Sequence, residues 1–256
     1  MGNKQDNKII EYWNQRSKNF KFAGAKNPIT DELEKEYLIK FVRKNKAILD
    51  VGCGAGNLLK SFYHLSKDLT GIDVSQGMIN QAKKKYKKIN FLVADVIDEK
   101  NFSTSIKNKK FDLIFTKRCI QNILSQKKQL RIINFLGSKL KKNGKLILCE
   151  SSATAQKDIN ILRKKIGLKK ITPPWHNLFF DDKKIQKTKF KNLKLREIHS
   201  FMATFFFVTR IINAYIKNKE GKKPHYLDSH NILAKNLPQN LLNKFSQTKV
   251  YEFIKI

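Results

Sequence analysis

The sequence predicts an α/β fold: a doubly wound, mostly parallel sheet of seven strands with helices on both faces and an antiparallel last strand. Short apolar runs alternate with helical stretches between residues 47 and 149, as in a parallel sheet with crossover helices. The runs are continuous rather than alternating, as in strands buried on both faces. A length of 256 residues, 41% of them hydrophobic, suits one domain with a full core.

Residues 1–45 are expected to form an N-terminal helical lid. A first helix is predicted over residues 9–20. A second helix is expected to be capped by Thr30 and to end at Lys44 and Asn45.

Residues 46–150 are expected to form a cofactor-binding core. Asn57 begins a predicted helix, Ser75 caps the next, and a later one is expected to stop near Asn143 and Gly144. Five strands are predicted between and beside these helices, over residues 47–51, 69–73, 91–94, 111–116 and 145–149.

Residues 151–256 depart from this alternation and are expected to carry substrate-specific structure. A helix end is predicted near Gly167, followed by a rigid loop over residues 173–177 with the sequence Pro-Pro-Trp-His-Asn. Strands are predicted over residues 195–201 and 249–256. No room follows the last strand for a crossover helix, so it should run antiparallel beside the strand before it. Residues 205–247 form an insertion rich in aromatic residues and Asn.

The chain is strongly basic, with 53 Lys and Arg against 21 Asp and Glu and a formal charge of +32. Such a charge suits a polyanionic partner, and RNA or an anionic membrane surface is one interpretation. Only seven of the basic residues are Arg, the residue that binds phosphates and bases bidentately. The alternative, a Lys-rich composition that gives a solvated surface, is therefore preferred.

The apolar runs, the N-terminal residues and the cysteines indicate no membrane span, no signal peptide and no zinc site. No apolar run is long enough to cross a bilayer; the longest candidate, residues 201–212, is interrupted by Arg210. The N-terminal residues lack the apolar core of a signal peptide, so a cytoplasmic location is expected. Cys53, Cys119 and Cys149 form no cluster with zinc spacing, so they are expected to be reduced thiols and no metal site is predicted.

A glycine-rich turn follows the first predicted strand. Asp50 ends that strand and Gly52, Gly54 and Gly56 follow, so the backbone can turn sharply and a ligand can lie against it. Ligands of open α/β sheets bind beyond the carboxyl ends of the strands, where this turn lies. Asp73 ends the next strand and can accept both hydroxyls of a ribose.

A dinucleotide is the competing ligand for this turn. Its fingerprint requires a glycine three residues after the second one, and Asn57 stands at that position. Asp95 and Val96 follow the third strand and suit an adenine amino group and ring edge. A ligand with an adenine, a ribose and an amino-acid tail therefore fits the pattern better.

These motifs resemble the class I S-adenosylmethionine-dependent methyltransferases, which have a Rossmann-like fold. The resemblance covers residues 48–150 through Leu-Asp-Val-Gly-Cys-Gly-Ala-Gly, Gly-Ile-Asp-Val-Ser-Gln-Gly-Met, Ala-Asp-Val, Phe-Asp-Leu-Ile and Leu-Lys-Lys-Asn-Gly-Lys-Leu-Ile-Leu. It implies S-adenosylmethionine as cofactor. The implied contacts are Asp50, Gly52 and Gly54 to the methionine part, Asp73 to the ribose, Met78 to one adenine face, Asp95 and Val96 to the adenine edge, and Thr116 in the methyl-donor pocket.

The family usually has an N-terminal lid, and residues 12–17 look like one. Tyr12 or Arg16 would then meet the cofactor carboxylate. The alternative is an amphipathic helix that packs Ile9, Tyr12 and Trp13 on the sheet edge, and both descriptions can hold together.

The candidate catalytic residues lie outside the glycine-rich turn. The family reaction displaces a methyl group in line, so a hydroxyl acceptor needs a base, and His176 in the Pro-Pro-Trp-His-Asn loop is the candidate. The alternative is that His176 only fixes that loop. Arg118, after the fourth strand, either binds an anionic substrate group or pairs with a local carboxylate. Glu150 is a further candidate for a supporting acid or a substrate contact.

The acceptor is expected to be a small polar metabolite methylated at oxygen: a sugar, a nucleotide-sugar or a glycan precursor. Trp175 and Phe179 would stack on a sugar or cap a core. One alternative is an RNA methyltransferase that uses the basic surface, although the fourth strand is followed by Thr-Lys-Arg-Cys rather than the motif for amine methylation of nucleobases. Another is a non-catalytic cofactor-binding module.

Overall fold

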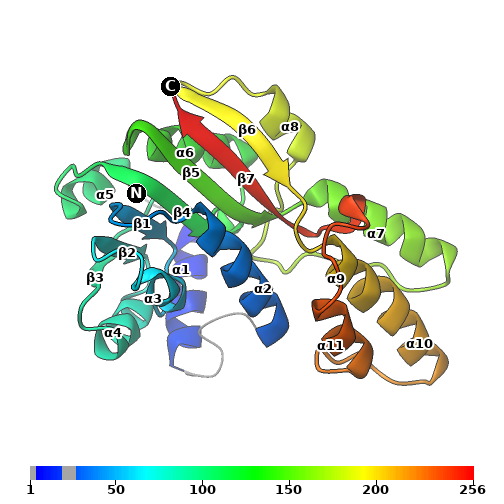
Figure 1. Ribbon diagram of the computed structural model, residues 1–256. Coiled ribbons are helices and arrows are strands. Elements are labelled where there is room, and N and C mark those ends of the chain that lie inside the picture. Colours follow the sequence, from blue (N-terminus) through cyan, green and yellow to red (C-terminus); the bar gives the residue numbers. More distant parts are fainter. Residues whose placement is uncertain (1–3, 19–26) are drawn as a thin grey trace.

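A seven-stranded sheet forms the centre of the molecule (Figure 1). The computed structural model describes residues 4–18 and 27–256, apart from the side chains of Lys4 and Asp6. The strands lie in the order β3-β2-β1-β4-β5-β7-β6. Their bounds are β1 Ile48–Val51, β2 Leu69–Asp73, β3 Asn90–Val93, β4 Phe111–Lys117, β5 Leu140–Ser151, β6 Leu193–His199 and β7 Thr248–Lys255. Strands β1 to β5 pair in parallel and β7 is antiparallel to both neighbours, which confirms the predicted fold class.

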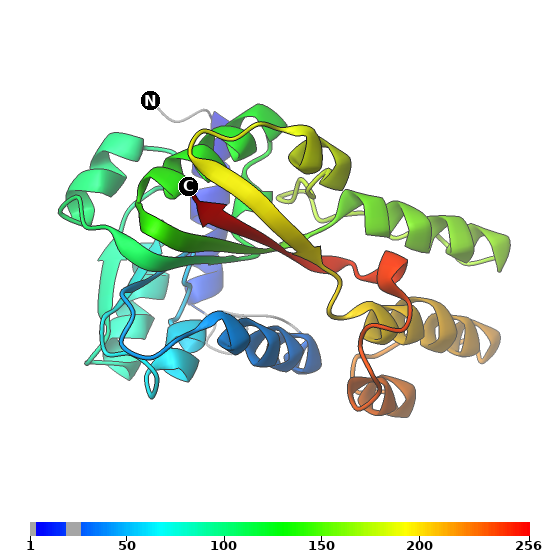
Figure 2. The same ribbon diagram turned by 45° about the horizontal axis from the view of Figure 1, so that its top comes forward.

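The last strand lies inside the sheet rather than at its edge. Lys145 of β5 pairs with Ile254 of β7, and Lys194 of β6 pairs with the same residue from the other side. Figure 2 shows β7 between β5 and β6. The predicted antiparallel pairing of the last two strands is therefore confirmed, with the strand bounds shifted by one or two residues.

Both faces of the sheet are buried, as the continuous apolar runs predicted. Ile48 of β1 packs in one core cluster with Leu59 and Phe62, whereas Leu49 packs in a second cluster with Ile133. Helices over the first half of the chain are α3 Asn57–Phe62, α4 Gln76–Lys85, α5 Glu99–Ser105 and α6 Gln126–Ser138. This packing fixes the strand ends on which the site is built.

Two predicted helix boundaries are wrong. The helix α2, Pro28–Leu38, is capped by Asn27, whose side chain accepts hydrogen bonds from the amides of Ile29 and Thr30. Thr30 therefore lies inside the helix; Pro28 supplies the first helical residue, where its missing amide hydrogen costs nothing. The helix ends at Leu38 and is followed by a 3-10 turn, η2 Ile39–Phe41.

The predicted helix end at Asn143 and Gly144 is also wrong. Helix α6 ends at Ser138, and Asn143 lies within β5 with a φ of 61°. The register between β4 and β5 shifts here, from the Phe111–Leu140 pair to the Leu113–Lys145 pair. Left-handed backbone of this kind suits Asn and Gly and forms an irregularity in the strand.

The rest of the chain adds helices beside this sheet. The first helix, α1 Lys4–Ser17, was predicted to extend to residue 20; residues 19 and 20 lie outside the described residues. After β5 come α7 Ala153–Lys165, which ends before Gly167 as predicted, and α8 Asp182–Lys187. The predicted insertion is helical: α9 Ala203–Phe207, a π-helical turn η4 Val208–Ile212, α10 Asn213–Lys219, α11 Ser229–Lys235 and a 3-10 turn η5 Asn243–Phe245.

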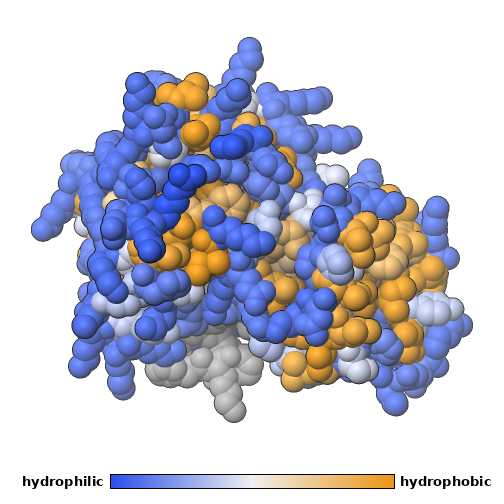
Figure 3. Space-filling view, viewed as in Figure 1, coloured by the Kyte–Doolittle hydropathy of each residue, from blue (hydrophilic) through white to orange (hydrophobic). Residues whose placement is uncertain are grey.

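Helices α7 and α9 to α11 lie together at one end of the molecule, opposite α3 to α5 (Figures 1 and 2). Figure 3 shows apolar residues gathered over this end on the viewed face, and Leu233 and Leu241 are 61% and 63% exposed. Among the described residues, no helix combines the length and apolarity needed to cross a membrane.

Candidate functional site

One large cavity opens at the carboxyl ends of the parallel strands. Its volume is about 670 Å³, in the upper part of the range of about 300–1,000 Å³ for small-molecule sites. The loops after β1, β2, β3, β4 and β5 line it, together with α1, residues 171–179, and the segments before β7. It therefore lies where the fold class predicts a ligand.

The glycine-rich turn forms one wall of this cavity. Gly52, Gly54 and Gly56 have φ values of 75°, 52° and 78°. A Cβ on Gly52 would lie 2.4 Å from the Cys119 sulfur, so a larger side chain has no room there. The backbone consequently lies bare against the cavity at Gly52 and Gly54, as predicted.

Asp50 lies behind this turn and has an unusual environment. Its side chain lines the cavity, the residue is 1% exposed, and its Oδ1 atom has no hydrogen-bond partner among the described residues. Burial raises the pKa of Asp50 to about 7, against the opposing charge of Lys117. An unpaired, desolvated carboxylate is unfavourable unless a ligand supplies a hydrogen bond or positive charge.

Asp73 and Asp95 lie at the ends of the next two strands. Asp73 accepts hydrogen bonds from the amides of Gly54, at 2.9 Å, and Ser75, at 2.8 Å. Burial nevertheless raises the pKa of Asp73. Asp95 accepts from the amide of Ile97, and both carboxylates line the cavity. Each carboxylate oxygen that accepts one backbone hydrogen bond keeps a second lone pair for a ligand.

The structure brings most of the predicted cofactor residues together. Tyr12, Arg16, Met78 and Val96 line the same cavity as the glycine turn and the three aspartates. Thr116 is the exception. It is fully buried outside the cavity lining and donates its hydroxyl to Glu150 Oε1 at 2.7 Å. The predicted place of Thr116 in the methyl-donor pocket stays a prediction, and in the structure the buried Glu150 carboxylate takes its hydroxyl.

Glu150 supports the loop after β4. Its carboxylate accepts hydrogen bonds from the amides of Cys119, Ile120 and Gln121, at 3.0 to 3.2 Å. Burial raises the pKa of Glu150 to about 7, although these hydrogen bonds and the one from Thr116 oppose the rise. Glu150 therefore acts on the site by holding the backbone of this loop in place.

Helix α1 both packs on the core and lines the cavity. Ser75 donates to Asn14 Oδ1 at 2.7 Å, which joins α1 to the start of α4. The Trp13 indole donates to Asn122 Oδ1 at 2.8 Å. The Arg16 guanidinium lies 5.7 Å from the centroids of the Tyr12 and Trp13 rings. The packing description of this helix is therefore met, and the contact of Tyr12 or Arg16 with the cofactor carboxylate stays a prediction.

His176 lies among aromatic rings at the cavity wall. Its ring centroid is 4.5 Å from that of Tyr12 and 5.8 Å from that of Trp13. Burial, and then the charge of Arg16, lower the pKa of His176. Its Nδ1 atom is shielded from water and has no hydrogen-bond partner in the described part of the chain. A neutral imidazole in this position can accept a proton.

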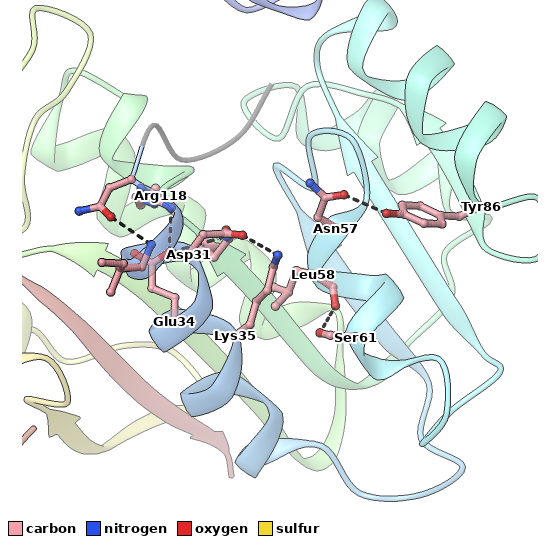
Figure 4. A network of polar contacts seen from close by, with 11 residues as sticks. Asp31, Glu34, Lys35, Asn57, Leu58, Ser61, Tyr86 and Arg118 are labelled. Atoms are coloured by element: carbon pink, nitrogen blue, oxygen red, sulfur yellow. Dashed lines mark hydrogen bonds and ion pairs between the residues drawn. The ribbon is translucent and has the colours of Figure 1, made fainter. Parts of the chain in front are cut away.

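Arg118 takes part in an ion-pair network with α2 (Figure 4). Its guanidinium lies 2.8 Å from the fully buried carboxylate of Glu34, and Lys117 lies 3.6 Å from the same group. Lys117 and Lys35 each lie 2.5 Å from Asp31. Burial alone would raise the pKa of Asp31, but the two lysines outweigh it and lower that pKa to about 2. Arg118 pairs with a carboxylate, but this partner lies 84 residues away rather than nearby in the sequence as predicted. Arg118 also lines the cavity, and its predicted contact with an anionic substrate group stays a prediction.

Gln247 and Arg210 are among the cavity residues that no sequence pattern indicated. Gln247 stands just before β7, at the end of the insertion, and no motif marked it. Arg210 lines the cavity from the π-helical turn. In the sequence, Arg210 is marked only as the charge that interrupts the apolar residues 201–212.

Comparisons with known proteins agree with this architecture. A family model described as "Methyltransferase domain" matches residues 48–144. The chain is 32% identical over 130 residues to the ubiquinone biosynthesis O-methyltransferase of Pelagibacter ubique, covering 45% of this chain and 51% of that protein. It is 23% identical over 243 residues to a ubiquinone/menaquinone biosynthesis C-methyltransferase of Campylobacter jejuni, and this match covers 90% of this chain and 98% of that protein. The chain therefore spans about half the length of the first relative and nearly all of the second.

A solved structure with the same fold is magnesium protoporphyrin IX methyltransferase from Synechocystis PCC 6803 with bound SAH. The TM-score is 0.59 over 98% of this chain and 100% of that chain, at 13% identity. At this identity the likeness shows the fold, including the mixed sheet with its antiparallel strand.

Proposed function

We propose that the chain is a class I S-adenosylmethionine-dependent methyltransferase and that it methylates a small polar molecule at oxygen. The proposed acceptor class is a sugar, a nucleotide-sugar or a glycan precursor. The unpaired Asp50 oxygen beside the glycine turn supports the cofactor part of the proposal most, because it calls for a ligand that carries a positive group.

The cavity residues fit S-adenosylmethionine, the cofactor of this family. Asp50 would accept a hydrogen bond from the ammonium group of the methionine part, beside the bare backbone of Gly52 and Gly54. Asp73 would accept from the ribose hydroxyls, and Asp95 would face the adenine edge. When bound, the cofactor supplies an electrophilic methyl group that an acceptor oxygen displaces.

His176 is proposed to accept the proton that a hydroxyl acceptor loses. Its lowered pKa keeps the ring neutral at pH 7, and its Nδ1 atom has no hydrogen-bond partner among the described residues that would compete for a proton. Tyr12 and Trp13 pack against the ring and exclude water from it. General-base catalysis of this kind contributes about 10²- to 10⁴-fold to a rate.

The names of the relatives favour a second acceptor class. Both the Pelagibacter and the Campylobacter proteins are named for quinone biosynthesis. Methylation of a quinone precursor at a ring hydroxyl, as the name of the Pelagibacter O-methyltransferase suggests, would use the same donor site and base. The wall formed by Trp13, Phe179 and Phe206 would contact such a ring.

Calorimetric titration with S-adenosylmethionine and with S-adenosylhomocysteine tests the cofactor part of the proposal. Asp73→Ala should weaken binding, whereas Asp68→Ala, an exposed carboxylate paired with Lys109, should leave binding unchanged. Absence of binding by folded wild-type protein would overturn the proposal.

Radiolabelled methyl transfer to sugars, nucleotide-sugars, quinone precursors and RNA then tests the acceptor. Transfer to RNA alone would replace the acceptor class with a nucleic acid. Cofactor binding without transfer to any acceptor would favour a non-catalytic module.

A further inference from the structure

The order of the strands divides the cavity into two parts. The residues proposed to hold the cofactor follow β1, β2 and β3, on one side of β4. Ser151 ends β5 on the other side of β4, paired with Thr248 at the start of β7. Adjacent strands lie about 4.8 Å apart, so the ends of β1 and β5 are separated by about 10 Å. The β5 side of the cavity, which also includes Thr172 and Phe206, is therefore the place for the acceptor.

A chain of amide groups fixes the orientation of Gln247 in this part of the cavity. The carbonyl oxygen of Ile171 can only accept, and it accepts from the side-chain amide of Gln156 at 3.3 Å. The Gln156 side-chain oxygen therefore faces Gln247 and accepts from its Nε2 atom. Because Gln247 turns its NH₂ group toward Gln156, its own side-chain oxygen is left over.

The remaining oxygen of Gln247 is unsatisfied. The residue lines the cavity, is 7% exposed, and its Oε1 atom has no hydrogen-bond partner among the described residues. Leaving such a buried acceptor unpaired is unfavourable. A ligand that donates a hydrogen bond, such as a hydroxyl, would remove this cost.

Arg210 supplies a positive charge to the same part of the cavity, and its side chain there is exposed to solvent. Within the described residues its guanidinium makes no hydrogen bond or ion pair and lies only against the Phe206 ring, 5.9 Å from the centroid. Arg163 stands beside it and donates to the backbone oxygen of Arg210 and, at 2.8 Å, to that of Lys169. Desolvation, and then the charge of Arg163, lower the pKa of Arg210. Two neighbouring guanidinium groups favour an anion between or beside them.

The segments that carry Gln247 and Arg210 pack together. The ring centroids of Phe207 and Phe245 lie 5.2 Å apart, and these residues precede Arg210 and Gln247 by three and two positions. Ile211 and Phe245 belong to one small apolar cluster with Ile159 of α7. The cluster therefore holds both side chains at one side of the cavity. Arg210 also lies in a π-helical turn, a local distortion common at functional sites.

We propose that Gln247 and Arg210 recognise the acceptor: Gln247 accepts a hydrogen bond from an acceptor hydroxyl, and Arg210 binds an oxyanion, a phosphate or carboxylate, on the same molecule. The inference rests on the proposed function and restricts the class of acceptor. Among small polar acceptors it selects hydroxylated molecules with an anionic group, such as sugar phosphates, nucleotide-sugars or sugar acids, over neutral sugars.

The test is calorimetric titration of the full chain saturated with S-adenosylhomocysteine, using galactose, galactose 1-phosphate and galacturonate as probes. At least one charged sugar should bind wild-type protein about 10-fold or more tightly than galactose, and which one does so separates phosphate from carboxylate recognition. Arg210→Gln should remove this preference, and Arg210→Lys should keep part of it. Arg43→Gln, at an exposed position outside the cavity, is the matched control.

Gln247 is tested with Gln247→Met, which keeps the length of the side chain but lacks the acceptor. It should weaken all probes that bind by about two- to tenfold, whatever their charge. Binding of S-adenosylhomocysteine should be unchanged in every variant, which separates this result from loss of folding or of the cofactor site.

The outcomes distinguish the two proposals. Loss of S-adenosylhomocysteine binding in wild-type protein would contradict the proposed function. Cofactor binding together with equal affinity for charged and neutral sugars, or no charged-sugar binding up to about 10 mM, would overturn the assignment of Arg210. Unchanged probe affinity in Gln247→Met would overturn the assignment of Gln247.

Discussion

Binding of the cofactor should depend on pH through the ionisation of Asp50. Only the ionised carboxylate attracts the ammonium group of the methionine part, and burial places the pKa of Asp50 at about 7 in the unliganded protein. The charged groups that act on it are Lys117, which lowers this pKa, and Asp73, which raises it. Binding should therefore convert a half-protonated carboxyl into a carboxylate and release a proton.

The size of the effect follows from the ionised fraction. With a pKa of about 7, roughly half of the Asp50 carboxyls are ionised at pH 7, about one in eleven at pH 6 and about one in a hundred at pH 5. The apparent association constant should therefore fall about fivefold from pH 7 to pH 6 and about fiftyfold from pH 7 to pH 5.

Calorimetry with S-adenosylhomocysteine, which carries the same ammonium group, measures this dependence. Titrations at pH 5, 6 and 7, each in two buffers with different enthalpies of protonation, give both the affinity and the number of protons released. Asp50→Asn should bind weakly with little dependence on pH, and the exposed Asp68→Asn should behave like wild type. An association constant that changes less than about twofold between pH 5 and pH 7, or an equal slope in Asp50→Asn, would refute the role of this carboxylate.

Three further predictions concern stability and catalysis. The pKa of Asp50 is about 7 in the folded protein and 3.8 ordinarily, so the unfolded chain binds fewer protons between these pH values. The free energy of unfolding of the unliganded protein should therefore fall by at most about 4 kcal/mol as pH rises through this window. Chemical denaturation of Asp50→Asn should show a smaller fall. For Asp31 the sign is opposite, because its pKa is lowered to about 2. Its ionised carboxylate contributes about 2 kcal/mol to the free energy of unfolding above pH 4, and this contribution is lost as pH falls toward 2. The loss should be absent in urea unfolding of Asp31→Asn. His176→Asn should lower kcat about 10²- to 10⁴-fold and leave the affinity for S-adenosylhomocysteine unchanged. Because burial and Arg16 lower the pKa of His176, wild-type kcat should decline with acid only below pH 6.5. A stopped-flow pH profile without such a decline would contradict the role of His176 as base.

The cofactor side of the cavity was predictable because short stretches of chain determine it. Asp50, Asp73 and Asp95 each stand close to the carboxyl end of a strand, so the fold class alone brings them to one edge. The glycines between Asp50 and Asn57 show where the backbone must turn. All seven strands were predicted for the same reason, since each is a separate apolar run.

The contacts that the sequence did not predict are hydrogen bonds and ion pairs between residues far apart in the sequence. Thr116 is the residue before the last of β4, and Glu150, 34 residues later, takes its hydroxyl. The partner of Arg118 is Glu34 on α2, and no sequence pattern links positions 84 residues apart. The Gln247 oxygen is unpaired only because Gln156 and Ile171 arrange the neighbouring amides. Such contacts depend on packing between elements, which periodicity and local motifs do not report.

The position of β7 also constrains the order in which the protein can fold during synthesis. Strand β6 pairs with β7 and with no other named strand, so it has no place in the sheet until residues 248–255 have been made. The five parallel strands are complete by residue 151, and nearly a hundred residues separate them from the strand that closes the gap. Until then β5 presents an unpaired edge, to which another chain can add. A nascent chain should therefore be most prone to aggregation late in translation, and β7 should end that exposure on both sides at once.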